Sequence, residues 1–292
     1  MLQAFHHPSD VLRFAASQER AEAALALVIV TDVTGGAMRG RGAMMCVTQE
    51  AVAGYVSNGC VDADIIFQAR ELLGTVGVKH LRYGEGSPFR DITLPCGGRI
   101  DVLITANVDT LNLESLSADL DARRAVNLRA EDFTKTYTPP LRLRIAGRGE
   151  AVSALARQAD SAGFSVILQS PDADIAAGLT LAHFDHLTDP NAPPAISDDA
   201  WTAVVVMFHD HDWEPHILAQ ACRGEAFYIG AMGSPRTHDL RKSALAAYGL
   251  NTEEIARIHG PIGLIPSMRD ANLLALSTLA QIVNEARRGG AL

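Results

Sequence analysis

The clearest pattern in the chain is the alternation of short apolar runs with stretches of helical spacing over residues 141–292. The runs 141–146 and 164–168 are typical of buried strands, and apolar residues between them recur every three or four positions. The run 202–208 is almost continuously apolar, as expected for a central parallel strand covered on both faces, and 226–231 is a fourth run. This alternation predicts a Rossmann-like parallel-sheet domain.

The first half of the chain has a less regular pattern. Strands are predicted for the apolar runs 25–31, 44–48, 52–56 and 102–105. The spacing of apolar residues predicts core-facing helices over 8–22 and 63–73. We therefore expect a mixed α/β domain over residues 1–110, so that the whole chain is of the α/β class.

Residues 111–140 are charged and weakly periodic and end in Pro139-Pro140, which predicts a partly helical linker between the two domains. At the other end of the second domain, 270–287 has the pattern of an amphipathic helix. Its side chains expected to be buried are Leu273, Leu276, Leu279, Ile282 and Val283.

Composition narrows the class of protein. The net charge of -9 excludes a general nucleic-acid partner, which requires a basic face. The most apolar run, 23–30, is too short to cross a membrane, and the N-terminus lacks the layout of a signal peptide, so we expect a cytoplasmic protein. No two of the four cysteines form a C-x-x-C pair, and free thiols are expected.

Two cysteines follow or precede glycines in predicted turns. Cys60 follows Ser57-Asn58-Gly59 and precedes a predicted helix, whose positive end would favour the thiolate that binds metals or attacks electrophiles. The alternative is a tight turn with a small, half-buried cysteine. Cys96 lies in a second glycine-containing loop, and the spacing of the two is not that of a zinc site.

The segment 34–43 contains four glycines together with Arg39 and Arg41. Backbone amides freed by glycine, with arginine nearby, can bind a phosphate or another oxyanion. A hairpin loop with solvated arginines explains the same residues.

Gly147 and Gly149 begin the β-α-β unit of the second domain, as in dinucleotide-binding folds. The third glycine position holds Val152, and the usual ribose-binding carboxylate is replaced around Gln169 and Ser170. An NAD(P)-dependent oxidoreductase is therefore the alternative function and not the leading one.

Two further polar motifs follow predicted strands. The side chains of His209-Asp210-His211 could bind a metal or relay protons. This motif is the basis of a third hypothesis, that the protein is a metal-dependent hydrolase. The alternative is that the histidines form hydrogen bonds to backbone groups. Gly233 and Ser234 precede a predicted helix that Ser234 would cap, and Arg236 near its N-terminus would suit an anion.

The Gly147 loop, Ser170, His209 and Gly233 all follow predicted parallel strands. The carboxyl ends of such strands share one edge of the sheet, where ligands bind in open α/β folds. We expect these motifs to converge on one crevice, with the N-terminal glycine and cysteine loops as its facing wall.

The motifs in both halves resemble those of the XdhC/CoxI family. They are Gly-Gly-Ala-Met-Arg-Gly-Arg-Gly-Ala at 35–43, Ser-Asn-Gly-Cys-Val-Asp at 57–62, Leu-Pro-Cys-Gly-Gly-Arg-Ile-Asp-Val at 94–102, Phe-Tyr-Ile-Gly-Ala-Met-Gly-Ser-Pro-Arg-Thr at 227–237, and Ile-His-Gly-Pro-Ile-Gly-Leu at 258–264.

The resemblance implies an accessory protein, a chaperone rather than an enzyme. Such a protein binds the molybdenum cofactor, helps to sulfurate it and inserts it into an apo molybdenum hydroxylase such as xanthine dehydrogenase. A cysteine desulfurase would be a further partner, and a homodimer would suit the two-domain organisation. Cys60 would be the metal ligand. The expected cofactor-binding residues are Cys60, Cys96, Arg39, Arg41, Gly147, Gly149, His209, Asp210, Gly233, Ser234 and Arg236.

The chain departs from the family pattern at several positions. Asn58 and Asp62 stand where the family usually has Gly and Glu, and Glu150 replaces His. After Gly263 many members continue with Asp-Ile-Gly-Ala-Arg-Thr, whereas here only Arg269 of that motif is kept.

Overall fold

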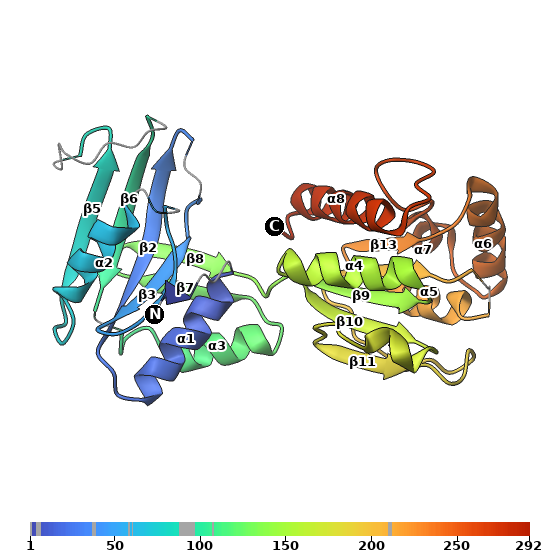
Figure 1. The fold of residues 1–292 in the computed structure, drawn as a ribbon, viewed down its shortest axis with the longest axis horizontal. Coiled ribbons are helices and arrows are strands. Elements are labelled where there is room, and N and C mark those ends of the chain that lie inside the picture. The colour runs from blue at the N-terminus through green and yellow to red at the C-terminus, as the bar shows by residue number, and fades with distance from the viewer. Residues whose placement is uncertain are drawn as a thin grey trace. The chain divides into compact units, whose positions relative to one another are not determined.

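The computed structural model describes residues 2–3, 7–36, 39–57, 59, 61–87, 97–106, 108–209 and 212–292. It divides into two compact units, Met1–Pro139 and Pro140–Leu292, so the boundary falls between the two adjacent prolines (Figure 1). Each unit has its own sheet and its own core, and the fold is mixed α/β throughout. No helix in the described part of the chain is both long and apolar enough to span a bilayer.

Unit 1 is built on a six-stranded sheet in the order β1-β4-β3-β2-β6-β5, in which only the β1–β4 pair is parallel. The strands are β1 (Leu2–Gln3), β2 (Leu25–Thr34), β3 (Met44–Thr48), β4 (Val52–Gly54), β5 (Val78–Gly84) and β6 (Arg99–Thr105). Helices α1 (Pro8–Arg20) and α2 (Asp62–Arg70) complete the part of the unit expected from the sequence.

The sheet of unit 1 is buried on both faces, which explains the continuous apolar run in β2. Leu27 and Ile29 belong to the core cluster that includes residues of α1, whereas Val28 and Val30 belong to the cluster that includes residues of α2. Because successive side chains of a strand point to opposite faces, a strand between two apolar layers has no polar alternation.

The segment expected to be a linker over 111–140 instead belongs to unit 1. It forms α3 (Leu113–Asp121) and a hairpin of β7 (Val126–Ala130) and β8 (Phe133–Tyr137). Leu113, Leu128 and Phe133 are buried in the same cluster as the residues of α1. In β7, buried and exposed residues alternate over only five positions, and so short a pattern among charged residues is easily taken for a linker.

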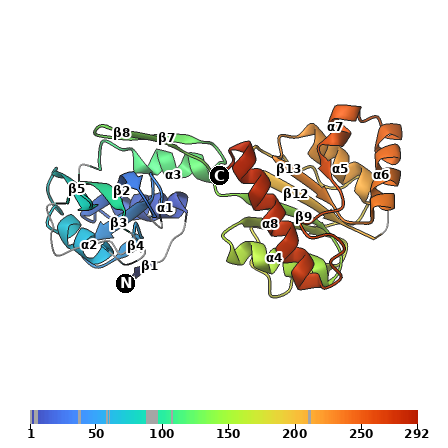
Figure 2. The ribbon, with the colours of Figure 1, turned by 90° about the horizontal axis from the view of Figure 1, so that it is seen from above.

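Unit 2 has the predicted Rossmann-like architecture, a six-stranded, entirely parallel sheet in the order β11-β10-β9-β12-β13-β14. The strands are β9 (Arg142–Gly147), β10 (Ser165–Ser170), β11 (His183–His186), β12 (Thr202–Met207), β13 (Tyr228–Ala231) and β14 (Ile258–His259). The helices are α4 (Glu150–Ser161), η1 (Ala173–Ala176), α5 (Glu214–Arg223), α6 (Pro235–Ala247), α7 (Thr252–Ala256) and α8 (Ala271–Gly289). The helices α4 and α8 cover one face of the sheet, and α5, α6 and α7 the other (Figure 2).

The helix α8 differs from its prediction in which residues it buries. Leu279 and Ile282 are buried as expected, but Leu273, Leu276 and Val283 are 52%, 59% and 42% exposed. Helical spacing alone does not tell which of two apolar faces meets the core.

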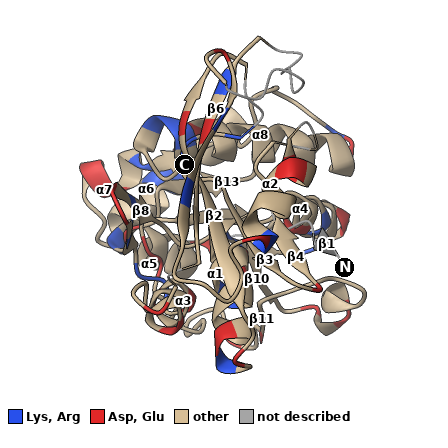
Figure 3. Ribbon diagram, turned by 90° about the vertical axis from the view of Figure 1, so that its left-hand side faces the viewer, with Lys and Arg blue, Asp and Glu red and all other residues tan. Residues whose placement is uncertain are grey.

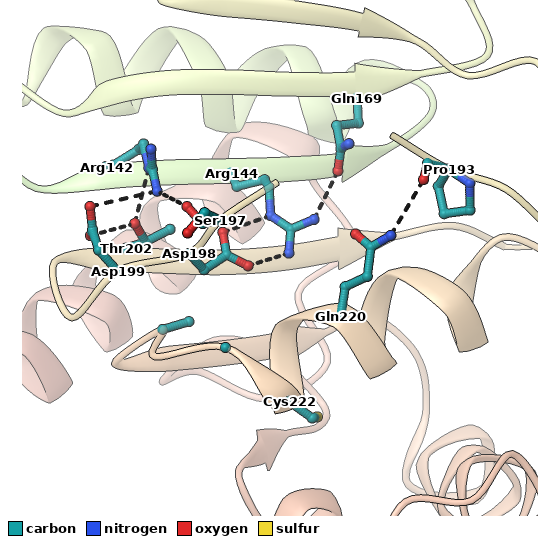
Figure 4. A network of polar contacts seen from close by, with 12 residues as sticks. Arg142, Arg144, Gln169, Pro193, Ser197, Asp198, Asp199, Thr202, Gln220 and Cys222 are labelled. Carbon is teal, nitrogen blue, oxygen red and sulfur yellow. Dashed lines mark hydrogen bonds and ion pairs between the residues drawn. The ribbon is translucent and has the colours of Figure 1, made fainter. Parts of the chain in front are cut away.

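A buried polar network lies between the sheet and the loop that precedes β12 (Figure 4). Nε and Nη2 of Arg144 in β9 donate to the two carboxylate oxygens of Asp198, at 3.0 and 2.5 Å, and Nη1 donates to Oε1 of Gln169 at 3.0 Å. Arg142, two residues earlier in β9, donates to the carbonyl oxygen of Ser197 at 2.6 Å. The loop is thereby fastened to the strand at the centre of the sheet.

Candidate functional site

The motif loops of unit 1 lie at one end of its sheet. Antiparallel pairing sets Arg99, at the start of β6, opposite both Thr34 at the end of β2 and Gly84 at the end of β5. Met45, near the start of β3, pairs with Gly54 at the end of β4. Segments 35–43, 55–61 and 85–98 therefore leave the same end of the sheet, the end toward which β2 and β5 point in Figure 1.

Contacts join the glycine and arginine loop to the segments next to both cysteines. The guanidinium carbon of Arg39 lies 4.6 Å from the ring centroid of Tyr55, which begins the Cys60 segment. Gly35 has a φ of +79°, and a Cβ there would come within 3.0 Å of the Cα of Gly98. Cys60 and Cys96 themselves lie outside the described residues.

Asp62 organises the Cys60 segment. Its Oδ1 accepts hydrogen bonds from the amides of Val56 and Ser57, at 3.1 and 2.9 Å, and its Oδ2 accepts one from the amide of Gly59 at 2.7 Å. The Oγ of Ser57 accepts a hydrogen bond from the amide of Val61 at 2.9 Å. The helix α2 begins at Asp62, one residue before the predicted start, and has no side-chain cap at Val61.

The first turn of α2 is also attached to the sheet. The hydroxyl of Tyr83 in β5 is 2.5 Å from Oδ2 of Asp64, to which it donates. Burial raises the pKa of Tyr83 above its ordinary value, and the hydrogen bond to Asp64 raises it further, so the phenol stays protonated and remains a donor. The helix that follows Cys60 is thus held in place from two sides.

Arg41 has a structural role that neither interpretation of its loop anticipated. Its Nε donates to the carbonyl oxygen of Thr31 at 3.1 Å, and its Nη2 to that of Thr134 at 3.2 Å. The guanidinium also stacks on the ring of Phe133, at 4.6 Å. Nζ of Lys135 donates to the carbonyl oxygen of Arg41 at 2.9 Å. An oxyanion would have to compete with these contacts for Arg41.

Charged residues of both signs alternate beside these loops, around β6 (Figure 3). Asp101 accepts two hydrogen bonds from Arg82, at 2.7 and 3.0 Å, and lies 3.4 Å from Nε of Arg99. Arg99 also donates to Asp32 at 2.6 Å. Because these charges pair with one another, the flank of the loops is not a basic patch.

In unit 2 the predicted motifs do share the carboxyl edge of the sheet. Since all six strands are parallel, the segments after Gly147, Ser170, Met207 and Ala231 leave it on the same side. The sheet runs outward in opposite directions from β9 and β12, so the Gly147 loop and His209 flank the point where strand order reverses, the usual ligand position in such folds. Asp210 and His211 lie outside the described residues.

The two glycines of the Gly-x-Gly sequence have different structural roles. A Cβ at Gly147 would come within 2.6 Å of the carbonyl oxygen of Met207, so close packing of β9 against β12 requires this glycine. Gly149 has a φ of +83° and is the N-cap of α4. Nε of Arg148 lies 3.6 Å from Oδ1 of Asp172. Gly147 is thus explained without a nucleotide.

A cavity of about 640 Å³ lies beside Gly233. Its lining residues are Gly233, Ser234, Pro235, Pro261, Ile262, Gly263, Leu264, Pro266, Ser267, Met268 and Arg269. The Oγ of Ser234 accepts a hydrogen bond from the amide of Thr237 at 3.1 Å, which confirms the predicted helix cap.

One exposed arginine lines this cavity, and a second is the sequence neighbour of a lining residue. Arg269 lines the cavity, and Arg236 follows Pro235. Within the described part of the chain neither has a hydrogen-bond or ion-pair partner, in contrast to Arg148 or Arg241. Arg269 was not among the expected site residues. It directly precedes Asp270, the N-cap of α8. Because the helix dipole disfavours a cation at a helix N-terminus, an arginine at this position was the sequence signal that could have identified it.

The described residues contain no group of three or more His, Cys, Asp or Glu side chains that would hold a metal ion. His209 is exposed. The hypothesis that it binds a metal depended on Asp210 and His211, and both this hypothesis and the prediction that His209 binds the cofactor stay untested.

The geometry defines a two-domain α/β protein with loops gathered at a sheet end in one unit and a cavity at the carboxyl edge of a Rossmann sheet in the other. Residues 143–282 match the model of the XdhC Rossmann domain, and residues 19–84 match that of the XdhC and CoxI family. Over 295 residues the chain is 33% identical to the molybdenum cofactor insertion chaperone PaoD of Escherichia coli (strain K12), which covers 94% of this chain and 87% of the relative. The chain belongs to the XdhC and CoxI family.

A solved structure shares the whole fold. The crystal structure of a xanthine dehydrogenase from Bacillus halodurans superposes with a TM-score of 0.78 over 97% of this chain and 96% of the other, at 20% sequence identity. The similarity extends over both units and shows the fold.

Proposed function

We propose that this protein is a molybdenum cofactor chaperone, which binds the cofactor and delivers it to an apo molybdenum enzyme. The observation that carries the proposal is the 33% identity, over 94% of the chain, to a protein named as a molybdenum cofactor insertion chaperone. The gathering of the motif loops in each unit supports it.

The cavity beside Gly233 fits a phosphorylated organic cofactor. Its volume of about 640 Å³ is in the range of small-molecule sites, about 300–1,000 Å³. Arg236 and Arg269 have donors to spare, and guanidinium groups bind phosphate in bidentate fashion. We assign the phosphate end of the cofactor to these two arginines.

In unit 1, Cys60 is our proposed ligand for molybdenum. Thiolates suit such a soft centre, and a cysteine placed just before the N-terminus of a helix has its thiolate favoured. The neighbouring residues fit this role because Asp62 holds the amides on either side of Asn58, and Arg39 covers Tyr55. Cys96, His209 and Asp210 remain further expected contributors.

Cofactor binding can be measured on anaerobically purified protein by releasing and quantifying the pterin. We expect about one cofactor per chain in the wild type, and weaker binding by Cys60→Ala. We expect Arg269→Ala and Arg236→Ala each to weaken binding at least tenfold, because a hydrogen bond to a charged group contributes about 1.5–3 kcal/mol. Arg223→Ala, an exposed arginine at the end of α5, is the matched control. No bound pterin, or equal binding by all variants, would contradict the proposal.

The proposal extends to sulfuration of the cofactor with a cysteine desulfurase and to a xanthine dehydrogenase-like client in the cytoplasm. A Cys60→Ala protein that still binds cofactor but no longer yields active client when a desulfurase is present would support a sulfur-handling role. Full activation by that variant would remove Cys60 from sulfuration and leave cofactor carriage intact.

NAD(P) binding is the alternative function of unit 2. The observation in its favour is the N-terminus of α4, where Gly149 leaves the first amides without a side-chain cap. Calorimetry with NAD and NADP separates the two functions. Saturable heat would favour an oxidoreductase, and its absence would exclude one.

A further inference from the structure

The apolar surface of α8 extends beyond the face that it buries in unit 2. Its inner face contributes Ala275, Leu279, Ile282 and Ala286 to the core of unit 2. Beside this face Leu273, Leu276 and Val283 are about half exposed. An apolar stripe this wide is typical of a helix that packs against more than one neighbour, and within unit 2 only the inner part of the stripe is covered (Figure 2).

The exposed residues have the spacing of a helix–helix contact. Leu273, Leu276, Ala280, Val283 and Arg287 follow one another at alternating intervals of three and four positions. This spacing is that of the seam along which two helices pack in a coiled coil. The middle position is alanine, whose small side chain permits close approach of a second helix.

The neighbouring segment enlarges the same apolar surface. The amide of Leu264 donates to the carbonyl oxygen of Ser277 at 3.2 Å, and the amide of Ile265 donates to Oγ of Ser277 at 2.8 Å. Both side chains lie beside α8 and are 55% and 56% exposed. Single exposed apolar residues are normal, but three on one stripe of a helix, with two more on the segment hydrogen-bonded to that helix, are typical of an interaction surface.

The charges at the two ends of α8 favour a second copy of the same helix. Asp270 lies at its N-terminus, and Arg287 and Arg288 lie in its last turn. In an antiparallel pair, Asp270 of each copy approaches the arginines of the other, and the helix dipoles oppose each other. A parallel pair would bring like charges together.

We propose that α8 forms the interface of a homodimer, packing antiparallel on its partner about a two-fold axis near Ala280. A symmetric interface uses the same surface of both copies, as this self-complementary helix requires. A helix of 19 residues is about 28 Å long, and stable interfaces bury about 800 Å² per partner, so Leu264 and Ile265 form the flanks of the contact.

The dimer is tested on the full chain without cofactor by sedimentation equilibrium, so the result is independent of the proposed function. We expect a dimer whose dissociation constant rises at least a hundredfold in Leu276→Glu and in Val283→Glu, since each substitution occurs twice in the interface. Leu240→Glu, a change of an equally exposed leucine of α6, is the matched control. A monomeric wild type, or a dimer weakened no more by Leu276→Glu than by Leu240→Glu, would overturn the proposal.

A cross-link provides a second measurement that does not depend on the tolerance of α8 for charge. Ala280→Cys should form a disulfide with its counterpart under mild oxidation, because both lie next to the two-fold axis. Leu240→Cys should not cross-link. Equal cross-linking of the two variants would also overturn the proposed interface.

Discussion

Arg144 and Asp198 form a bidentate ion pair in which both side chains are buried, at 0% and 1% exposure. They lie 54 residues apart, in β9 and in the loop before β12. Breaking such a pair leaves a charge in the interior without its counter-charge.

We expect Arg144→Met to lower the free energy of unfolding by about 3–5 kcal/mol, because Asp198 would remain buried and unpaired. The measurement is urea denaturation. Arg157→Met is the matched control, since Arg157 pairs with Glu150 on the surface, where an ion pair contributes about 0–1 kcal/mol. Equal losses in the two variants would mean that burial of the Arg144 pair has no special effect.

His238 should make the stability of unit 2 depend on pH. Its ring packs against Gly260, where a Cβ would come within 2.2 Å of Nδ1, and the residue is 8% exposed. Burial, followed by Lys242 and Arg241, lowers the pKa of His238 below 6.5. Below pH 6.5 the unfolded chain therefore binds a proton that the folded chain excludes, and stability falls as the pH falls.

We expect the free energy of unfolding to decrease between pH 7.5 and pH 5, and to decrease less in His238→Phe, which cannot titrate. His259 of unit 2, whose pKa is also lowered chiefly by burial, keeps some slope in the variant. Urea midpoints across this range provide the measurement. An unchanged slope in His238→Phe would rule out His238 as a source.

Cys46 and Cys222 should not react in the folded protein at pH 8. They are 0% and 3% exposed, and burial raises their pKa values to about 12 and about 11. Because the thiolate is the reactive form, alkylation should require unfolding. Peptide mapping after native and denaturing alkylation measures this, and native labelling as fast as denatured labelling would contradict it.

Asp62→Ala should loosen the segment before α2. The amides of Val56, Ser57 and Gly59 lose their acceptor, and we expect their hydrogen exchange to rise at least tenfold, since an unsatisfied amide costs about 1–3 kcal/mol. Exchange measured by mass spectrometry tests this. Asp62→Glu, which keeps a carboxylate, should exchange more slowly than Asp62→Ala; the opposite order would show that the carboxylate is not what holds the segment.

The sequence predicted the fold where burial leaves a pattern in consecutive residues. The run 202–208 contains β12, which ends at Met207, and the run 25–31 contains the buried residues 25–30 of β2. Two features depended on contacts distant in sequence and were missed. Arg41 meets Thr134 from 93 positions away, and the β7–β8 hairpin is recognisable only from the core that it covers.

The candidate site was predictable to the extent that the sheet positions it. The parallel topology was enough to bring Gly147, Ser170, His209 and Gly233 to one edge. It gave no indication that residues after Pro261 form a wall of the cavity, because that wall follows the last strand and has no periodic pattern. Gly147 shows the converse, a motif residue whose presence is explained by a neighbouring strand.

The arrangement of the loops in unit 1 has a consequence for how the family can diversify. Segment 35–43 begins after Thr34, and segment 85–98 runs from Gly84 to Arg99. Arg99 pairs with both Thr34 and Gly84, so the two loops are anchored at the same level of the sheet. An insertion in either loop would lengthen it without moving the anchor of the other. Each loop can thus change separately in length and sequence over evolutionary time while the sheet beneath stays the same.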